Sequence, residues 1–268
     1  MSERLLSKMG IGVFPLFVPD IPAEEKYRLI VNAGFNATCI YWGDENKYEQ
    51  LKVAKEVGLA IDNIHSQNDN ANLLWQEGNE GDNRLNVLLS CVEDCALHDI
   101  STVIIHLTGF PPYPSVSELG LNRIEEIVKL AEQKKVKLAF ENLWTFEHLD
   151  ALFERFPSPN VGFCYDSGHE NLNLYHDCLA SYGDRLFALH INDNFCDGYD
   201  AHVLPFDGTI NWNEKMRKLN QYRNVSCFTL EVYKLESGTH KKSSIYNKLS
   251  AEEFLNMAYQ KAVNLLEM

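Results

Sequence analysis

Long apolar runs are missing from this 268-residue chain. No stretch of about 18 apolar residues occurs, so the sequence predicts no transmembrane helix. The first nine residues are short and polar and lack the apolar stretch of a secretory signal. The seven cysteines are scattered without a CxxC pair, which is typical of a reduced protein and not of a disulfide framework. We therefore expect a cytoplasmic protein with no membrane partner.

Positive charge is also scarce. Lysine and arginine together number 24 against 38 aspartates and glutamates, which gives a formal net charge of −14. A surface this acidic repels the phosphates of a nucleic-acid backbone. We expect no nucleic-acid partner.

Short apolar runs alternate with amphipathic stretches along the whole chain. Most of these runs lack polar alternation, as expected for parallel strands that are buried on both faces. We predict eight strands: Gly10–Leu16, Ala37–Trp42, Ala60–His65, Thr102–Leu107, Lys137–Glu141, Val161–Asp166, Leu186–Ile191 and Cys227–Val232. Eight β/α units, in a chain close to the typical barrel length of about 250 residues, predict an α/β fold: a single (β/α)₈ TIM barrel domain over residues 1–268. No GxGxxG motif follows the first strand, which disfavours an open doubly wound sheet.

Helices are predicted between the strands. Leu85, Leu88, Leu89 and Val92 form one apolar face in the segment 84–98, and Ser250 with Glu253 forms a capping-box pattern before the last helix. Other predicted helices cover 23–33, 45–57, 119–134, 145–156, 172–182 and 212–222. Two long polar segments, 66–83 and 233–249, follow strands three and eight, where they would lie over the active-site face as lids.

Six predicted strands end at, or close to, a side chain that can bind a metal ion. These residues are His65, His106, Glu141, Asp166, His190 and Glu231. A single histidine at such a place is most often a hydrogen-bonded core residue, and a single carboxylate is often a helix cap. Six together, in phase with the strands, predict one pocket at the carboxyl-terminal face of the barrel. Mixed carboxylate and imidazole ligands suit a divalent cation such as Mn²⁺, Zn²⁺ or Co²⁺.

Further candidate ligands lie just beyond the strands. His169 follows Asp166 by three residues, and Asp200 and His202 form an Asp-Ala-His sequence after the seventh strand. Each of these, taken alone, is equally compatible with a surface role. Asp193 is better placed to orient a ligand than to bind metal.

Four sequence strings resemble the xylose-isomerase-like barrel superfamily. They are Phe140-Glu141-Asn142, Tyr165-Asp166-Ser167-Gly168-His169, Leu189-His190-Ile191-Asn192-Asp193 and the segment from Asp200 to Trp212. This superfamily includes sugar-phosphate isomerases and epimerases, ketose 3-epimerases, inosose dehydratases and AP endonucleases of the endonuclease IV class (AP endonuclease family 2).

The resemblance has different implications in different branches. In the epimerase branch it implies one metal held by Glu141, Asp166, His190 and Glu231, with His169 contacting substrate oxygens. In the endonuclease branch it implies three zinc ions held by a larger set. That set would be His65, His106, Glu141, Asp166, His169, His190, Asp200, His202 and Glu231, and every position carries an acceptable residue.

Charge and aromatic content favour a sugar substrate. Aromatic residues that include Trp42 and Trp144 lie at or just after predicted strand ends, where they would contact the apolar face of a carbohydrate. One departure stands out: ketose 3-epimerases carry an arginine shortly after the histidine that matches His190, and none follows here. A phosphorylated substrate would require binding groups such as Lys242, Ser243 and Ser244.

The sequence therefore predicts an enzyme of carbohydrate metabolism, a divalent-metal-dependent sugar or sugar-phosphate isomerase or epimerase. The expected reaction moves a proton through a metal-stabilised enediolate between two catalytic glutamates, Glu141 and Glu231. The alternatives are an endonuclease IV-like zinc phosphodiesterase and an inosose-type dehydratase. The expected partner is a small-molecule carbohydrate, and homo-oligomerisation is left open.

Overall fold

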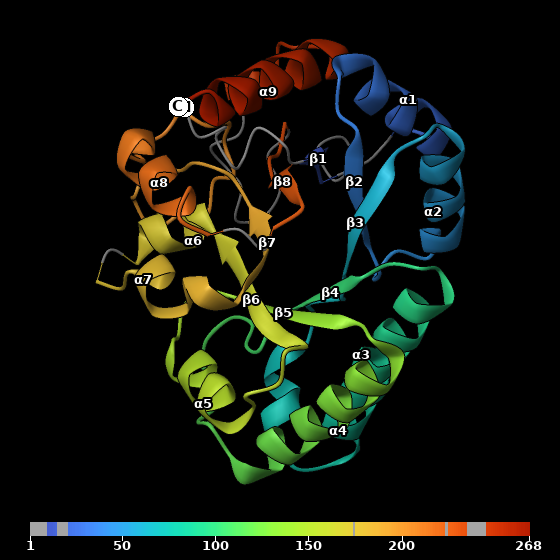
Figure 1. The fold of residues 1–268 in the computed structure, drawn as a ribbon, viewed down its shortest axis with the longest axis vertical. Helices are drawn as coiled ribbons and strands as arrows, with labels where there is room; N and C mark the ends of the chain where they lie inside the picture. Colours follow the sequence, from blue (N-terminus) through green and yellow to red (C-terminus); the bar gives the residue numbers. More distant parts are fainter. Residues whose placement is uncertain (1–9, 15–20, 174, 223–224, 235–244) are drawn as a thin grey trace.

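A computed structural model describes residues 10–14, 21–173, 175–222, 225–234 and 245–268. Eight parallel strands alternate with helices, and each strand pairs with its neighbours in the chain (Figure 1). The strands are β1 (Gly10–Val13), β2 (Ala37–Tyr41), β3 (Ala60–His65), β4 (Thr102–Ile105), β5 (Lys137–Glu141), β6 (Val161–Asp166), β7 (Leu186–His190) and β8 (Cys227–Leu230).

The sheet closes on itself. Strand β8 pairs in parallel with β1 along four residues. Between β7 and β8, the backbone N–H of Ile191 donates to Thr229 at 2.9 Å, and the N–H of Glu231 donates to Ile191 at 3.0 Å. The predicted (β/α)₈ TIM barrel is therefore confirmed.

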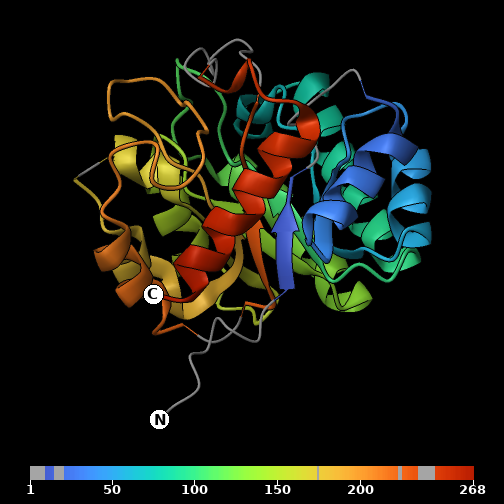
Figure 2. The ribbon, with the colours of Figure 1, turned by 90° about the horizontal axis from the view of Figure 1, so that it is seen from above.

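The helices surround the strands in Figures 1 and 2. They are α1 (Ala23–Ala33), α2 (Lys47–Glu56), α3 (Asn79–Leu97), α4 (Glu118–Lys134), α5 (Glu147–Arg155), α6 (Ser167–Leu172), α7 (Cys178–Tyr182), α8 (Trp212–Leu219) and α9 (Ala251–Leu266), with short 3₁₀ turns η3 (Ala71–Trp75) and η4 (Gly183–Arg185). The predicted capping box opens α9, because Ser250 Oγ accepts from the N–H of Glu253 and the Glu253 carboxylate accepts from the N–H of Ser250. No helix among the described residues is long and apolar enough to cross a membrane.

One predicted helix, 172–182, is wrong. Helix α6 follows β6 directly and ends at Leu172, and α7 begins at Cys178, with Asn173 and residues 175–177 outside both helices. Asp166 caps α6 through its side chain, which accepts a hydrogen bond of 2.6 Å from the N–H of His169. Helices of six and five residues are too short to show a helical repeat in the sequence.

Strand alternation sets which residues face the barrel interior. The buried residues Ile104, Ala139, Cys164 and Ala188, one from each of β4 to β7, form a small apolar cluster separate from the large core between strands and helices. Successive side chains of a strand point to opposite faces. Residues two positions further along must therefore also point inward, now at the carboxyl-terminal end of the barrel.

Candidate metal centre

The inward-facing positions at the carboxyl-terminal ends of the strands carry the candidate ligands that the sequence predicts. Counting two residues from each member of the inner cluster leads to His106, Glu141, Asp166 and His190. Strand β3 ends in His65, and Glu231 follows β8 directly. The fold thus gathers all six predicted strand-end residues at one end of the barrel.

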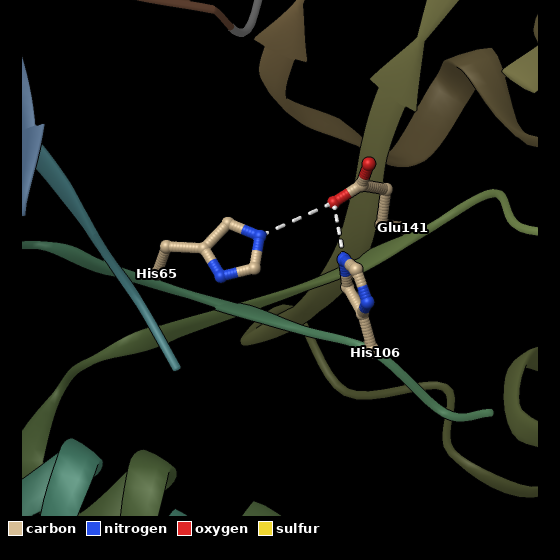
Figure 3. Close-up of side chains that lie close together, drawn as sticks. All are labelled: His65, His106 and Glu141. Atoms are coloured by element: carbon tan, nitrogen blue, oxygen red, sulfur yellow. Dashed lines mark hydrogen bonds and ion pairs between the residues drawn. The ribbon is translucent and has the colours of Figure 1, made fainter. Parts of the chain in front are cut away.

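Glu141 lies at the centre of this group. Its Oε2 atom is 3.0 Å from His106 Nε2, 3.6 Å from His65 Nε2 and 3.1 Å from His190 Nδ1. Its Oε1 atom is 3.3 Å from His169 Nδ1. Figure 3 shows the rings of His65 and His106 directed at this one carboxylate.

A second group shares Glu141. Glu141, Asp166, His190 and Glu231, all buried, place one ligand atom each within 4.8 Å of the others. His190 Nδ1 lies 2.8 Å from Glu231 Oε2, so two carboxylates approach the same ring nitrogen from different strands.

A third group lies beside the first two. His169 from α6 meets Asp200 and His202 from the long loop between β7 and α8. Asp200 Oδ2 is 3.2 Å from His169 Nε2 and 2.9 Å from His202 Nε2. The other ring nitrogen of His202, Nδ1, lies 2.8 Å from the backbone oxygen of Glu231, and this contact orients the ring.

Two asparagines, which the sequence reasoning missed, hold Asp166 in place. The side chain of Asn142 accepts from the N–H of Asp166 at 2.7 Å and donates to its carbonyl at 2.9 Å. The side-chain amide of Asn192 donates to Asp166 Oδ2 at 2.7 Å. Gly168 permits this approach, because a Cβ at that position would clash with the Asn192 side chain. The available signal was an asparagine directly after Glu141 and another two residues after His190.

Asp193 organises the loop that carries Asp200 and His202. Its carboxylate accepts from the indole Nε1 of Trp212 at 2.9 Å and from the backbone N–H groups of Asn194, Phe206 and Ile210 at 2.9–3.1 Å. It acts on the loop and makes no ligand group with the other residues described.

Charge in this centre is balanced between buried carboxylates and imidazoles. Burial by itself would raise the pKa of Glu231, but the positive charge of His190, whose Nδ1 lies 2.8 Å from the carboxylate, lowers the pKa to about 2. The pKa of Glu141 is likewise held well below its usual range, because His190 and His106 outweigh the effect of burial. Burial opposes the protonated form of His190, yet its anionic neighbours keep the pKa well above the usual value. Such an arrangement stabilises positive charge at the position where the ligand atoms meet.

The donor set suits a divalent cation. His190 is fully buried, and neither ring nitrogen makes a hydrogen bond of good geometry to the described residues, although two carboxylates lie close to Nδ1. Buried polar atoms normally have partners. Imidazole nitrogens and carboxylate oxygens are the ligands that Zn²⁺, Mn²⁺ and Co²⁺ accept.

A cavity of about 690 Å³ opens above the centre. Glu141, His169 and Glu231 lie in its lining, and Tyr41 and Trp144 form part of its wall. The ring of Trp144 meets the ring of His169 edge to face at 5.5 Å between centroids.

Trp42 is not at this cavity. Strand alternation turns Tyr41 toward His65 and the next residue, Trp42, outward. The indole of Trp42 is buried against α3, where Nε1 donates to Asp94 at 2.6 Å. The structure therefore gives Trp42 a packing role where the sequence predicted substrate contact.

The polar segment 66–83 forms a wall of the cavity that the body of the barrel holds in place. Arg123 donates to the carbonyls of Leu74 and Gln76 at 2.9 and 2.7 Å, and Trp75 Nε1 donates to Leu107 at 2.6 Å. These bonds favour a fixed wall over the predicted lid. Most of the other predicted lid, including Lys242, Ser243 and Ser244, lies outside the described residues.

The family follows from a match to known proteins. A family model described as "Xylose isomerase-like TIM barrel" matches residues 27–249. This chain belongs to that family. The resemblance found in the sequence strings is thereby confirmed.

Two solved structures share the fold of this family member. D-psicose 3-epimerase from Clostridium cellulolyticum H10 has a TM-score of 0.74 at 16% identity, covering 97% of this chain and 98% of its own. The 3-keto-D-glucoside 4-epimerase YcjR from E. coli, in its apo form, has a TM-score of 0.70 at 18% identity, covering 97% of this chain and 100% of its own. At identities this low, the two matches show a shared fold alone.

One curated relative is similar in sequence. The uncharacterized protein y4fM of Sinorhizobium fredii is 33% identical over 162 residues, which are 58% of this chain. The chain spans about half the length of that relative.

Proposed function

We propose that this protein is a divalent-metal-dependent sugar isomerase or epimerase. One observation carries the proposal: Glu141, Asp166, His190 and Glu231, from four successive strand ends, bring their ligand atoms within 4.8 Å of one another. Two of them, Glu141 and Glu231, also line the cavity where a substrate would bind. The sugar epimerases among the proteins of similar fold support the same reaction class.

The metal would be held by Glu141, Asp166, His190 and Glu231. A bound divalent ion would supply Lewis acidity, which stabilises the negative charge that develops when a proton leaves the carbon beside a carbonyl. The remaining chemistry belongs to side chains of the chain itself.

Glu141 and Glu231 are placed to move the proton. They come from β5 and from the end of β8, and they approach His190 Nδ1 to 3.1 and 2.8 Å. One carboxylate takes the proton and the other returns it. Return to the opposite face of the same carbon gives an epimer, and return to the neighbouring carbon gives an aldose–ketose isomer. His169 lines the cavity beside Glu141 and can donate a hydrogen bond to a substrate oxygen.

Deuterium exchange tests the proposal without knowledge of the product. The protein, loaded with Mn²⁺, Zn²⁺ or Co²⁺, is incubated with a panel of ketoses and aldoses in deuterated water, and the loss of the proton signal next to the carbonyl is followed by NMR. We expect exchange with at least one sugar, abolished by a chelator and restored by metal. Metal bound at full occupancy with no exchange in any sugar would overturn the proposal. A product that has lost water would instead assign the inosose-type dehydratase reaction.

A second candidate, phosphodiester hydrolysis, is favoured by the three adjoining ligand groups. His65 and His106 join Glu141 on one side, and His169, Asp200 and His202 form another group nearby. Closely spaced metal ions activate water for attack on phosphate esters. Against this, no lysine or arginine is among the described residues that line the cavity, and the net charge is −14. We expect no incision of a duplex that contains an abasic site, and metal-dependent cleavage at catalytic protein concentration would reverse the order of the two candidates.

A further inference from the structure

The cavity is larger than one sugar ring requires. At about 30 Å³ for each water-sized volume, 690 Å³ holds roughly 23 such volumes, about twice the number of non-hydrogen atoms in a ketohexose. The candidate ligands form only one part of the lining. A monosaccharide held there would leave the rest of the cavity unfilled.

The remaining part, which we call the outer chamber, is formed by three loops. Its walls are the seven consecutive residues 67–73 after β3, the segment 108–110 after β4, and Leu143 with Trp144 after β5. Amide side chains are dense on the first wall, where Gln67, Asn68 and Asn70 contribute to the lining beside Asn72, whose own amide is bonded to the loop after β4. Amides can donate and accept hydrogen bonds and therefore match hydroxyl groups.

An exposed aromatic ring also lines the outer chamber. Phe110 lines the cavity with 69% of its surface exposed. An exposed ring of this size in a cavity wall offers an apolar face to a ligand. One wall rich in amides and one aromatic ring together suit a sugar ring, which has hydroxyls at its edge and C–H groups on its faces.

Charge in the outer chamber argues against a phosphate group. Among the described lining residues none is lysine or arginine, whereas Asp69 contributes a carboxylate. Among the described lining residues, a phosphate would meet no cationic side chain and one like charge. A neutral group fits the chamber better.

The outer chamber is preformed. The side-chain amide of Asn72 donates to the carbonyl of Phe110 at 2.8 Å, and its oxygen accepts from the N–H of Gly109 at 2.8 Å. The loops after β3 and β4 are thus joined at the chamber itself. Arg84 Nη1 donates to the carbonyl of Gln67 and fixes the start of the same wall. A wall that is already ordered costs little conformational entropy when a ligand binds.

We propose that the outer chamber binds a neutral glycosyl unit attached to the reacting sugar, so that the preferred substrate is a glycoside or disaccharide. This inference rests on the proposed sugar isomerase or epimerase activity for its reacting part. It concerns a different set of residues, the loops after β3, β4 and β5, and it can be measured by binding alone.

Three matched probes test the inference. Each of the four D-ketohexoses is compared as the free sugar, as its 6-phosphate and as its 6-O-glucoside, of which isomaltulose is the fructose example. With metal-loaded protein we expect the specificity constant for deuterium exchange to be at least about tenfold higher for the glucoside than for the free sugar, and lowest for the phosphate. Equal or lower values for the glucoside in all four series would overturn the inference and leave the proposed function standing.

A variant locates the effect. Phe110→Ala removes the exposed ring and leaves the backbone carbonyl that Asn72 binds. It should lower the specificity constant for the glucoside about tenfold and change that of the free sugar less than twofold. Tyr175→Ala, which removes a fully exposed aromatic side chain that is absent from the cavity lining, is the matched control and should change neither. An equal loss for both sugars in Phe110→Ala would refute a separate glycosyl site.

Calorimetry distinguishes a failure of the proposed function from a failure of the glycosyl-site inference. If no ketohexose in any form undergoes exchange, the proposed function fails for these sugars. Binding of isomaltulose and fructose to the metal-loaded protein then decides the inference on its own. Tighter binding of isomaltulose, reduced in Phe110→Ala, supports the glycosyl site. No preference for isomaltulose refutes it.

Discussion

Glu141→Gln and Glu231→Gln give the sharpest test of the two-base mechanism. Glutamine keeps the shape of glutamate and one oxygen for a metal, but it cannot accept the proton. Each variant should therefore lose about 10²–10⁴-fold in turnover, the usual contribution of a positioned general base. That loss corresponds to about 3–5 kcal/mol of transition-state stabilisation.

The structure predicts that metal affinity will separate the two variants. Glu141 has ring nitrogens of His65, His106, His169 and His190 within 3.6 Å, whereas the Glu231 carboxylate has only His190 at ion-pair distance among the described residues. Of the three ligand groups described above, Glu141 belongs to two and Glu231 to one. Glu141→Gln should therefore lower metal affinity further than Glu231→Gln does.

The assay measures metal content and chemistry in the same samples. Metal is quantified by mass spectrometry after dialysis, and turnover and deuterium exchange are then measured at full occupancy. Glu147→Gln is the matched control, because Glu147 also lies next to a histidine, His148 at 4.0 Å, but outside the cavity lining. Exchange retained by one variant without product would identify the base that acts first. Near wild-type product formation by a fully metallated variant would show that the replaced glutamate is not an obligatory base.

Two further substitutions test the walls of the cavity. Arg123→Met leaves the carbonyls of Leu74 and Gln76 without their donor and should lower the free energy of unfolding by about 2–4 kcal/mol. Arg28→Met on the surface is the control and should leave the free energy of unfolding unchanged. Equal thermal midpoints for the two variants would refute the fixed wall. Asp193→Asn replaces one of two carboxylate oxygens, each of which accepts from two N–H groups, by an amide donor, and it should increase proteolysis within the loop 194–211 before the barrel unfolds. Unchanged cleavage rates would refute the organising role of Asp193.

The strand-end residues could be predicted because two physical rules coincide. Parallel strands buried on both faces read as continuous apolar runs, and their carboxyl ends must converge when eight of them close. A polar residue that ends such a run, such as Glu141 or Asp166, is therefore placed by the fold. The predicted strands extend past the observed ends of β1, β2, β4, β7 and β8, because an apolar residue follows within two positions of the end of each ladder; Pro15 and Leu16 of the first predicted strand lie outside the described residues.

Trp42 shows that the same reasoning does not determine which face of the barrel a side chain points to. A position near a strand end does not by itself place a side chain in the pocket, because the face alternates at every residue and Tyr41 has the inward position. Asn142 and Asn192 were missed for another reason. They act on Asp166 from neighbouring strand ends, and the partner of an amide side chain leaves no periodic signal in a sequence.

The acid limit of activity should come from loss of metal and not from protonation of the catalytic glutamates. Burial opposes protonation of the proposed ligand His190, yet its anionic neighbours hold its pKa well above the usual value, so without metal this ring binds a second proton more readily than an ordinary imidazole does. A metal ion must displace such protons, so affinity falls as pH falls. Glu231, with a pKa of about 2, stays ionised from pH 5 to 9.

The rate and the metal occupancy, measured together from pH 5 to 9, should fall in parallel on the acid side. A rate that falls while occupancy stays full would assign the acid limb to a catalytic group and contradict this account.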